Sequence, residues 1–357
     1  MKRTVKIATF ILMGAALVVC LCFYFSLNNY FVIDGSLIGG EEKVMMKEGS
    51  VDDSAIEVSD KIVLIAVGDI MLSRVVEQKM MARNDWNYPF LETASITSGA
   101  DIAFGNLETT VFPGNVVPSG SFAFRTDPKA LEGLKLAGFD VLSLANNHMM
   151  NFGRNGLEKT LQNLDATEIE HTGAGLSEED IYAPIIEDVR GVKIGFLSYS
   201  YAKEQSYDKT GEIYGTAYLD VATMKTQVEK LKQSVDVVVV SMHAGIEYEI
   251  EPSVAQKNFA HAAVDAGAEL VIGHHPHVVE TFEKYNDGYI IYSLGNFVFD
   301  QMWSEETRLG AIAEITFENK KISDIRFVPV KIFDYAQPKL AEGVDKEKIL
   351  ERLEIKG

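Results

Sequence analysis

Three of the seven histidines fall within four positions of the sequence, at His274, His275 and His277. Residues 269–272 before them, apolar apart from Glu269, predict a short buried strand, and a glycine and a proline end it. The histidines are therefore expected on the loop where this strand ends. Imidazoles held there can converge on one point, and Zn, Mn and Fe prefer nitrogen and carboxylate donors held in this way. The cluster predicts a metal site; a histidine-rich turn with no ligand is the alternative.

Other residues of metal-ligand type also follow apolar runs. These are Asp69 after 62–67, Asn106 and Glu108 after 102–105, Asn147 and His148 after 141–145, His243 after 240–242, and Asn296 after 292–294. The ends of strands on one side of an α/β sheet share a crevice. Apolar runs that end in Asp, Glu, Asn or His therefore predict the ligand set of a two-metal site.

Each of these residues also has an ordinary structural interpretation. Asp69 is suited to capping a following helix, Glu108 to a solvated loop, and the asparagines and histidines to a turn or the core. For no metal site to exist, all of these ordinary interpretations would have to be correct at once. The shared position of the residues at strand ends argues against such a coincidence. His171, in a Gly-rich turn, and His261, within a helical pattern, lack this position and are not candidates.

The elements that must position these residues alternate between strands and helices. Continuous apolar runs predict buried strands at 62–67, 141–145, 194–199, 235–240, 270–272 and 289–292. Apolar residues at i, i+3 and i+4 predict helices at 128–137, 155–164, 224–232 and 254–266. A C-terminal hairpin is expected from 310–317 and 322–330. The alternation indicates an α/β domain with a largely buried sheet.

The composition limits the class of ligand. The net charge of −19 at pH 7 argues against a nucleic-acid partner, because a basic face is the usual footprint of one. An acidic surface also repels other polyanions. An anionic substrate, whether phosphate or carboxylate, therefore needs local positive charge from a metal ion or from arginines in the site.

The N-terminus predicts a membrane anchor. Lys2, Arg3 and Lys6 precede the uncharged residues 7–27, which would span roughly 31 Å as a helix and match the hydrocarbon core of a bilayer. The positive-inside rule leaves residues 1–6 in the cytoplasm and the rest of the chain outside. A cleavable signal peptide or a lipidated cysteine is the alternative.

Beyond the predicted anchor, residues 28–60 are rich in Gly, Ser, Asp and Glu and have no sustained periodicity, which predicts a flexible stalk. Both cysteines lie in the anchor, so no disulfide is expected outside it. We therefore expect one domain at 61–335 and a C-terminal tail at 336–357.

Six motifs in this order make the chain resemble the CapA (PgsA) family. They are Gly68-Asp69-Ile70-Met71-Leu72-Ser73-Arg74, Gly105-Asn106-Leu107-Glu108, Ala145-Asn146-Asn147-His148, His243-Ala244-Gly245-Ile246-Glu247-Tyr248, Gly273-His274-His275-Pro276-His277-Val278 and Ser293-Leu294-Gly295-Asn296-Phe297. The resemblance covers about residues 62–333. It implies a membrane-attached protein of poly-γ-glutamate capsule synthesis or export. The implied fold, a sandwich of β-sheets flanked by helices, is related to calcineurin-like metallophosphoesterases.

The metallophosphoesterase pattern implies roles for single residues. Its first motif has an aspartate and, two residues later, a histidine; Asp69 matches the first, and Met71 occupies the second position. The missing nitrogen donor implies one ion or a differently chosen pair. His148 matches a histidine beside the substrate phosphate. The other implied metal ligands are Glu108, Asn147, His243, His275 and His277, with His274 as an alternative to His275.

Two functions follow from this resemblance. In the first, the protein is a hydrolase: two ions about 3.5 to 4 Å apart would clamp a phosphoryl oxygen, and His148 would protonate the leaving group or stabilise the developing charge. Arg74 or Arg308 would hold the anionic groups of the substrate by bidentate hydrogen bonds. In the second, the domain assists a membrane synthase or exporter, and its metal site binds carboxylates of the polymer. A structural subunit with one stabilising ion is a third, lower-ranked option.

Overall fold

The computed structural model describes residues 61–202, 206–208 and 213–354. These residues all belong to one unit, Val58–Gly357. The predicted anchor at 7–27 and stalk at 28–60 lie outside the described residues. Within the described ranges, no helix is long and apolar enough to cross a membrane.

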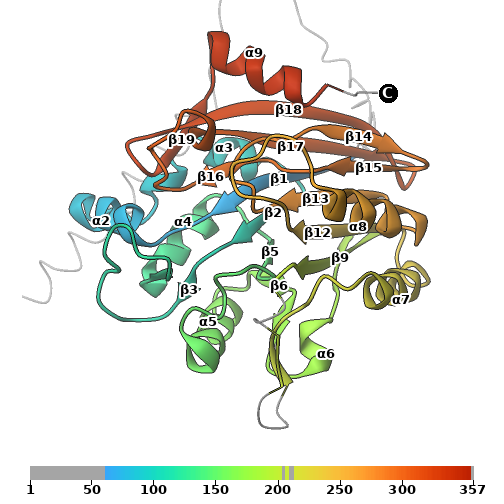
Figure 1. Ribbon diagram of the computed structural model, residues 1–357, viewed down its shortest axis with the longest axis horizontal. Coiled ribbons are helices and arrows are strands. Elements are labelled where there is room, and N and C mark those ends of the chain that lie inside the picture. The colour runs from blue at the N-terminus through green and yellow to red at the C-terminus, as the bar shows by residue number, and fades with distance from the viewer. Residues whose placement is uncertain (1–60, 203–205, 209–212, 355–357) are drawn as a thin grey trace, which may run out of the picture. The chain divides into compact units, whose positions relative to one another are not determined.

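Two mixed β-sheets form the centre of the described domain (Figure 1). The first consists, in order across the sheet, of β19 (Gln337–Leu340), β18 (Lys321–Phe333), β17 (Leu309–Glu318), β1 (Ile62–Ile70), β2 (Ile102–Leu107), β5 (Val141–Ser143) and β6 (Glu170–Thr172), and β16 (Asn296–Val298) pairs with β1. The second consists of β14 (Phe282–Tyr285), β15 (Gly288–Ile291), β13 (Leu270–His274), β12 (Val237–His243), β9 (Val192–Ser200) and β8 (Ile185–Val189). Strands β1, β2 and β5 are parallel, as are β9, β12, β13 and β15, so their carboxyl ends meet at one edge.

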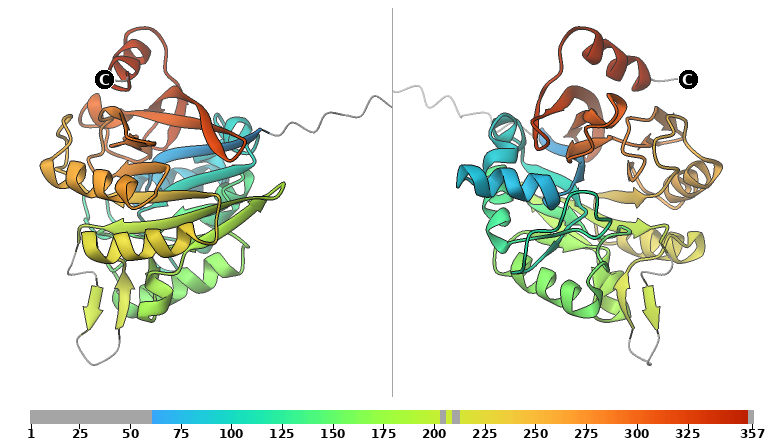
Figure 2. Two further views of the ribbon diagram at one scale, coloured as in Figure 1. Left: turned by 90° about the vertical axis from the view of Figure 1, so that its right-hand side faces the viewer. Right: turned by 60° about the vertical axis from the view of Figure 1, so that its left-hand side comes forward.

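Helices cover the outer faces of both sheets. They are α2 (Arg74–Arg83), α3 (Ala94–Thr97), α4 (Leu131–Leu136), α5 (Gly153–Asp165), α6 (Glu178–Ile181), α7 (Val221–Lys232) and α8 (Val254–Asp265). The last helix, α9 (Gly343–Arg352), instead packs on β17 and β18, where its Ile349 joins the apolar core between the sheets. In the right-hand view of Figure 2, α2, α4 and α5 lie on one side of the strands, and α7 and α8 on the other. Shorter elements complete the fold: β3 (Thr110–Val111) with β4 (Arg125–Thr126), β7 (Ala174–Gly175) with β11 (Ile213–Thr216) and β10 (Ser206–Asp208), and 3-10 helices at Tyr88–Phe90, Pro128–Ala130 and Glu306–Arg308.

The alternation of side chains along β1 explains why this strand is apolar on both faces. Leu64 and Ala66 pack between the two sheets, whereas Ile65 and Val67 pack under the helices of the first sheet. Phe104 of β2 and Phe196 of β9 stack across the interface with ring centroids 5.6 Å apart. The sheets are therefore held face to face by a continuous apolar core.

The strands and helices predicted from the sequence all have counterparts, with two differences of consequence. The strands form two facing sheets, as the resemblance implied, but β1, β12 and β13 extend further than predicted, as far as Ile70, His243 and His274. The structure also continues past residue 335, where the sequence analysis ended the domain. There β19 pairs with β18, and α9 packs on β17 and β18.

The buried carboxyl group of Glu280 is hydrogen-bonded to the first turn of α8. This helix begins with a capping box in which Ser253 and Gln256 bond each other's backbone N–H groups. The Gln256 amide also donates to Glu280 Oε2 (2.7 Å), while Glu280 Oε1 has no hydrogen-bond partner among the described residues. Glu280 is 1% exposed, and burial raises the pKa of its carboxyl to about 8.

The Glu280 carboxyl is expected to lower stability as the pH rises. The folded protein keeps a proton up to about pH 8 that the unfolded chain releases near pH 4.5. Between these values the free energy of unfolding should fall, relative to Glu280→Gln, by up to about 1.4 kcal/mol per pH unit. Urea unfolding of both proteins, in chelator at about pH 5 and about pH 8, measures the difference. A difference that is the same at both pH values would contradict this expectation.

Candidate metal centre

Strand ends from both sheets bring two carboxylates and a histidine together. Asp69 lies near the end of β1, Glu108 directly follows β2, and His243 is the last residue of β12. All three side chains are fully buried. Each offers one donor atom within 4.8 Å of those of the other two. A pair of carboxylates with an imidazole is a donor set suited to Zn, Mn or Fe.

A second donor group lies directly beside the first. Glu247, His275 and His277 also offer donor atoms within 4.8 Å of one another. The two groups are in contact: His277 Nδ1 is 3.2 Å from Asp69 Oδ2, and the His243 and His275 ring centroids are 4.9 Å apart. The residues from distant parts of the chain therefore form one centre with two adjacent donor groups.

In the loop after β13, two histidines have left-handed backbone conformations, which are unfavourable for residues other than glycine. His275 has φ 99° and His277 has φ 59°. Non-glycine residues in this region cost about 1 to 3 kcal/mol each, and such strain is concentrated at functional sites. Both side chains are nevertheless buried, at 3% and 2% exposed. The fold thus holds two strained histidines against the carboxylates of the first group.

A network of asparagine side chains orients the donors. The Asn106 amide donates to Asp69 Oδ1 (2.8 Å) and to Glu108 Oε1 (3.4 Å), and lies 3.2 Å from His243 Nδ1. Asn146 in turn donates to Asn106 Oδ1 (3.2 Å). Asn147 joins the centre directly, with its Oδ1 3.0 Å from His243 Nε2. Hydrogen bonds of this kind fix the direction of ligand atoms.

The pKa values of the two buried carboxyl groups are shifted in opposite directions. Burial opposes the charge of Asp69, but the rings of His274 and His277 beside it outweigh that effect and hold its pKa well below the usual range. Burial, and then the negative charge of Asp69, raise the pKa of Glu108 well above its usual range. Two such carboxylates are both ionised only when a cation compensates their charges.

His243 and His275 are neutral at pH 7. Burial lowers the pKa of His243 well below its usual value and that of His275 to about 3. A neutral imidazole keeps a lone pair, which is the form that binds a metal ion.

Unpartnered polar atoms in this centre fit a bound cation. Glu108 Oε2, both ring nitrogens of His274 and Nδ1 of His275 are buried and have no hydrogen-bond partner among the described residues. Each buried polar group without a partner costs about 1 to 3 kcal/mol. A metal ion is the ligand that satisfies carboxylate oxygens and imidazole nitrogens together. The residues present therefore fit a divalent metal centre. His274 lies beside it, with its Nδ1 3.5 Å from Asp69 Oδ1.

His148 lies at the edge of the centre, with Nε2 4.0 Å from Glu108 Oε2. The Phe124 N–H donates to Asn151 Oδ1 (2.9 Å), and the same oxygen lies 3.1 Å from His148 Nδ1. An amide oxygen only accepts, so Nδ1 carries the ring proton and Nε2 keeps the lone pair. Burial lowers the pKa of His148 to about 4, so the ring is neutral at pH 7. In this arrangement Nε2 does not hold the proton that a hydrolytic mechanism would take from it.

Arg74 lies close to the centre but is already paired. Its guanidinium forms an ion pair with Asp300 and donates to the Ser121 carbonyl oxygen (2.9 Å). It also lies 4.6 Å from the centroid of the Phe124 ring, which packs 4.0 Å from the ring of His148. Its charge is therefore largely compensated within the protein.

Two residues considered in the sequence analysis do not join the donors. Arg308 donates to Glu305 Oε1 (2.6 Å) and to the Ile332 carbonyl oxygen (3.3 Å), and in the described ranges it contacts none of the candidate ligands. Met71 is buried, and its Sδ accepts the Ser73 N–H (3.1 Å). The position where the metallophosphoesterase pattern has a histidine thus provides no nitrogen donor.

The ordinary interpretations of the candidate residues do not fit their positions. Helix α2 has Ser73, not Asp69, at its N-cap, and Glu108 is fully buried rather than solvated. His171 and His261 pair with carboxylates away from the centre, as their sequence positions suggested. Glu247 is a candidate ligand that could not be singled out from the sequence. Its one signal was its place in the motif that begins at His243.

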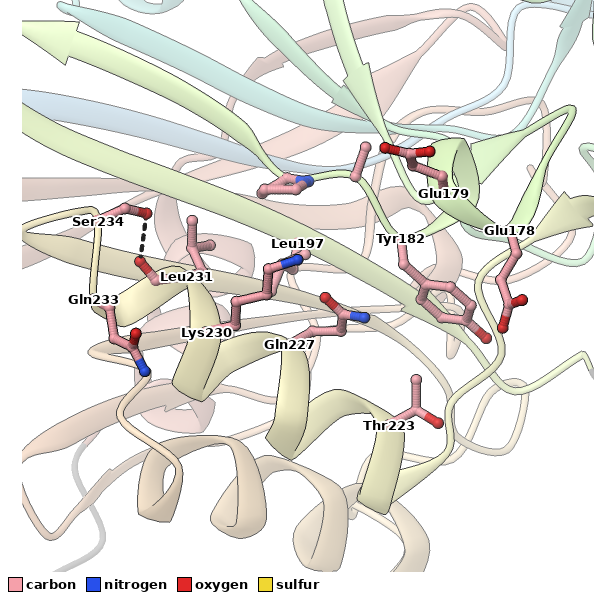
Figure 3. A pocket seen from close by; sticks show the side chains of 12 residues that line it. Glu178, Glu179, Tyr182, Leu197, Thr223, Gln227, Lys230, Leu231, Gln233 and Ser234 are labelled. Atoms are coloured by element: carbon pink, nitrogen blue, oxygen red, sulfur yellow. Dashed lines mark hydrogen bonds between the residues drawn. The ribbon is translucent and has the colours of Figure 1, made fainter.

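A pocket of about 700 Å³ lies elsewhere, between α6 and α7 over β9 (Figure 3). Tyr182 and Leu197 line one side, and Gln227, Lys230 and Leu231 of α7 line the other. None of its lining residues belongs to the donor groups.

The family model "Bacterial capsule synthesis protein PGA_cap" matches residues 63–301. The capsule biosynthesis protein CapA of Bacillus anthracis is 31% identical over 303 residues, covering 83% of this chain and 73% of that protein. The PGA biosynthesis protein CapA of Bacillus subtilis is 32% identical over 289 residues, covering 80% and 76%. A solved putative 5'-nucleotidase from Staphylococcus aureus is 14% identical, covering 82% of this chain and 58% of that chain, with a TM-score of 0.46.

Proposed function

Because this chain belongs to the family of bacterial capsule synthesis proteins, we propose that it assists the synthesis or export of a poly-γ-glutamate capsule by binding polymer carboxylates at a metal centre. The observation that carries the proposal is the convergence of Asp69, Glu108 and His243 within 4.8 Å, fully buried, beside a second group that contains His275 and His277.

The charges of the centre support a role for a cation. Asp69, Glu108 and Glu247 are acidic, the chain as a whole carries −19, and the nearby Arg74 is paired with Asp300. An anionic polymer would be repelled by this surface unless a cation were bound. A bound divalent ion supplies the positive charge to which carboxylates can bind; the nitrogen and oxygen donors favour Mn, Zn or Fe. One or two ions are proposed.

The protein is further proposed to act outside the cell membrane. The uncharged residues 7–27 follow Lys2, Arg3 and Lys6, a pattern that supports a single-pass anchor with the domain outside. In this location the domain would meet the polymer as it leaves a membrane synthase or an export subunit, which are the proposed partners.

Polymer binding is expected to depend on metal. Purified full-length protein should bind poly-γ-glutamate at least about 10-fold more tightly with Mn²⁺ than in chelator, because only the loaded centre attracts carboxylates. Isothermal titration at constant ionic strength measures this, and an uncharged polymer of similar length is the control. Equal affinity with and without chelator would rule out the proposed role of the centre.

Hydrolysis of a phosphate ester is the second candidate function, and the position of His148 beside Glu108 favours it. The neutral ring of His148 and the absence of a donor at Met71 count against it. Metal-dependent turnover of an aryl phosphate, above that of an Asn147→Ala, His148→Ala double variant, would favour hydrolysis over polymer binding alone.

A further inference from the structure

We infer that Glu247 is a metal ligand and that it forms, with His275 and His277, an outer cation position that takes a carboxylate of the substrate. The inference rests on the proposed function, since it concerns the same centre. It adds a ligand from a loop and assigns the two donor groups different tasks.

The loop that carries Glu247 is bound to the loop that carries the histidines. The Ala244 N–H donates to the His274 carbonyl oxygen (3.1 Å), and the Tyr248 N–H donates to the Pro276 carbonyl oxygen (2.8 Å). These two bonds lie on either side of Glu247. They hold the backbone around Glu247 beside the histidine loop, and its carboxylate lies within 4.8 Å of donor atoms of His275 and His277 although Glu247 is exposed to solvent.

The aromatic side chain next to Glu247 strengthens this attachment. Tyr248 has φ 70° and packs edge-on against Trp303, with ring centroids 4.8 Å apart. Its hydroxyl accepts a hydrogen bond from the Gln301 amide (3.4 Å). The strained backbone of Tyr248 is energetically costly, and such strain is concentrated at functional sites. It is therefore expected where the neighbouring Glu247 must be positioned as a ligand.

The histidines have atoms available for a ligand on this side. His275 Nδ1 is buried without a hydrogen-bond partner among the described residues. Nδ1 of His277 lies 3.0 Å from Asn296 Oδ1 and 3.2 Å from Asp69 Oδ2, so Nε2 is the ring nitrogen that these two groups do not engage. Two imidazoles and one carboxylate are a frequent donor set for a catalytic or exchangeable ion, which keeps a further position open.

The two groups differ in exposure, and this separates their tasks. Asp69, Glu108 and His243 are all 0% exposed, so an ion there is enclosed by the protein. Glu247 is exposed, so an ion held by it faces solvent. A carboxylate of an anionic chain can therefore reach the outer position without entering the core.

Metal counting on the full-length protein tests the inference. Equilibrium dialysis against Mn²⁺ should give two ions per chain for the wild type and one for Glu247→Gln, with the outer ion bound at least about 10-fold more weakly in the variant. The matched control is Glu249→Gln, which removes the same charge from an exposed position two residues along the loop and should keep both ions. A thermal melt of each metal-free variant checks that the fold is unchanged.

The outcomes separate this inference from the proposed function. Two ions in Glu247→Gln, bound as tightly as in the wild type, would overturn the inference and leave the proposed function standing. A single ion in the wild type, bound equally tightly in Glu247→Gln, would also overturn the inference and leave the proposed function standing. No ion in the wild type would overturn both. One ion fewer in both Glu247→Gln and Glu249→Gln would show a general effect of charge and would also overturn it.

Discussion

Replacing Asp69 by asparagine is expected to weaken divalent-metal binding by about 100-fold or more. Asp69 is fully buried, its Oδ1 accepts the Asn106 amide (2.8 Å), and its Oδ2 lies 3.2 Å from His277 Nδ1, so it touches both donor groups. Changes to residues that only orient a ligand cost 10- to 100-fold in affinity, so loss of a shared charged ligand should cost at least the upper value. Isothermal titration with Mn²⁺ or Zn²⁺ measures the effect, and metal-dependent polymer binding should be lost with it.

The matched control for this variant is Asp140→Asn. Asp140 is a partly buried aspartate just before β5, whose Oδ2 accepts the Ala103 N–H (2.8 Å), and it takes no part in the donor groups. It should retain wild-type metal affinity. If Asp69→Asn bound metal as tightly as Asp140→Asn, then Asp69 would not be a ligand.

Replacing Gly273 by alanine is expected to destabilise the domain by about 3 kcal/mol or more, or to prevent folding. A Cβ atom at this position would lie 1.8 Å from the Tyr292 carbonyl oxygen and 2.5 Å from its carbon. Both atoms belong to backbone, so a strand must move, and insertion into packed structure costs up to about 3 kcal/mol or occasionally more. Because His274 is the next residue of β13, metal affinity should fall as well. Urea unfolding and metal titration measure the two effects.

Gly114→Ala is the control for Gly273→Ala. The nearest atom to a Cβ at Gly114 is a side-chain atom, Cδ of Arg125, at 3.3 Å, no backbone atom is among the three nearest, and Gly114 is exposed. Its stability should stay within about 0.5 kcal/mol of the wild type, as for most surface changes. A Gly273→Ala protein that is as stable as Gly114→Ala would show that β13 and the Tyr292 segment are not packed as closely as described.

The positions of most candidate residues could be predicted because parallel strands impose them. Each apolar run is long enough to be a buried strand, and the carboxyl ends of parallel strands meet at one edge. A polar residue just after such a run is therefore placed near others of its kind, as Asp69, Glu108 and His243 are. The resemblance drawn from the six motifs is confirmed by the family model that matches residues 63–301.

The features that could not be predicted depend on contacts between distant segments, which local sequence patterns do not reveal. Apolar periodicity predicts that a strand is buried but not which partner covers it, so the division into two facing sheets followed from the resemblance and not from the pattern. The pairing of Arg74 with Asp300 joins residues far apart in the chain, and it leaves the arginine little charge for a substrate. Glu247 becomes a neighbour of His275 only because the Tyr248 N–H bonds to the Pro276 carbonyl oxygen of another loop.

Anomalous diffraction from crystals grown with Mn²⁺ tests the central claim most directly, because it locates the ion rather than counting it. The account predicts a peak bounded by Asp69, Glu108 and His243, and a second, weaker peak between Glu247, His275 and His277. Crystals that show no anomalous peak at either donor group, under conditions where Mn²⁺ is in excess, would contradict it.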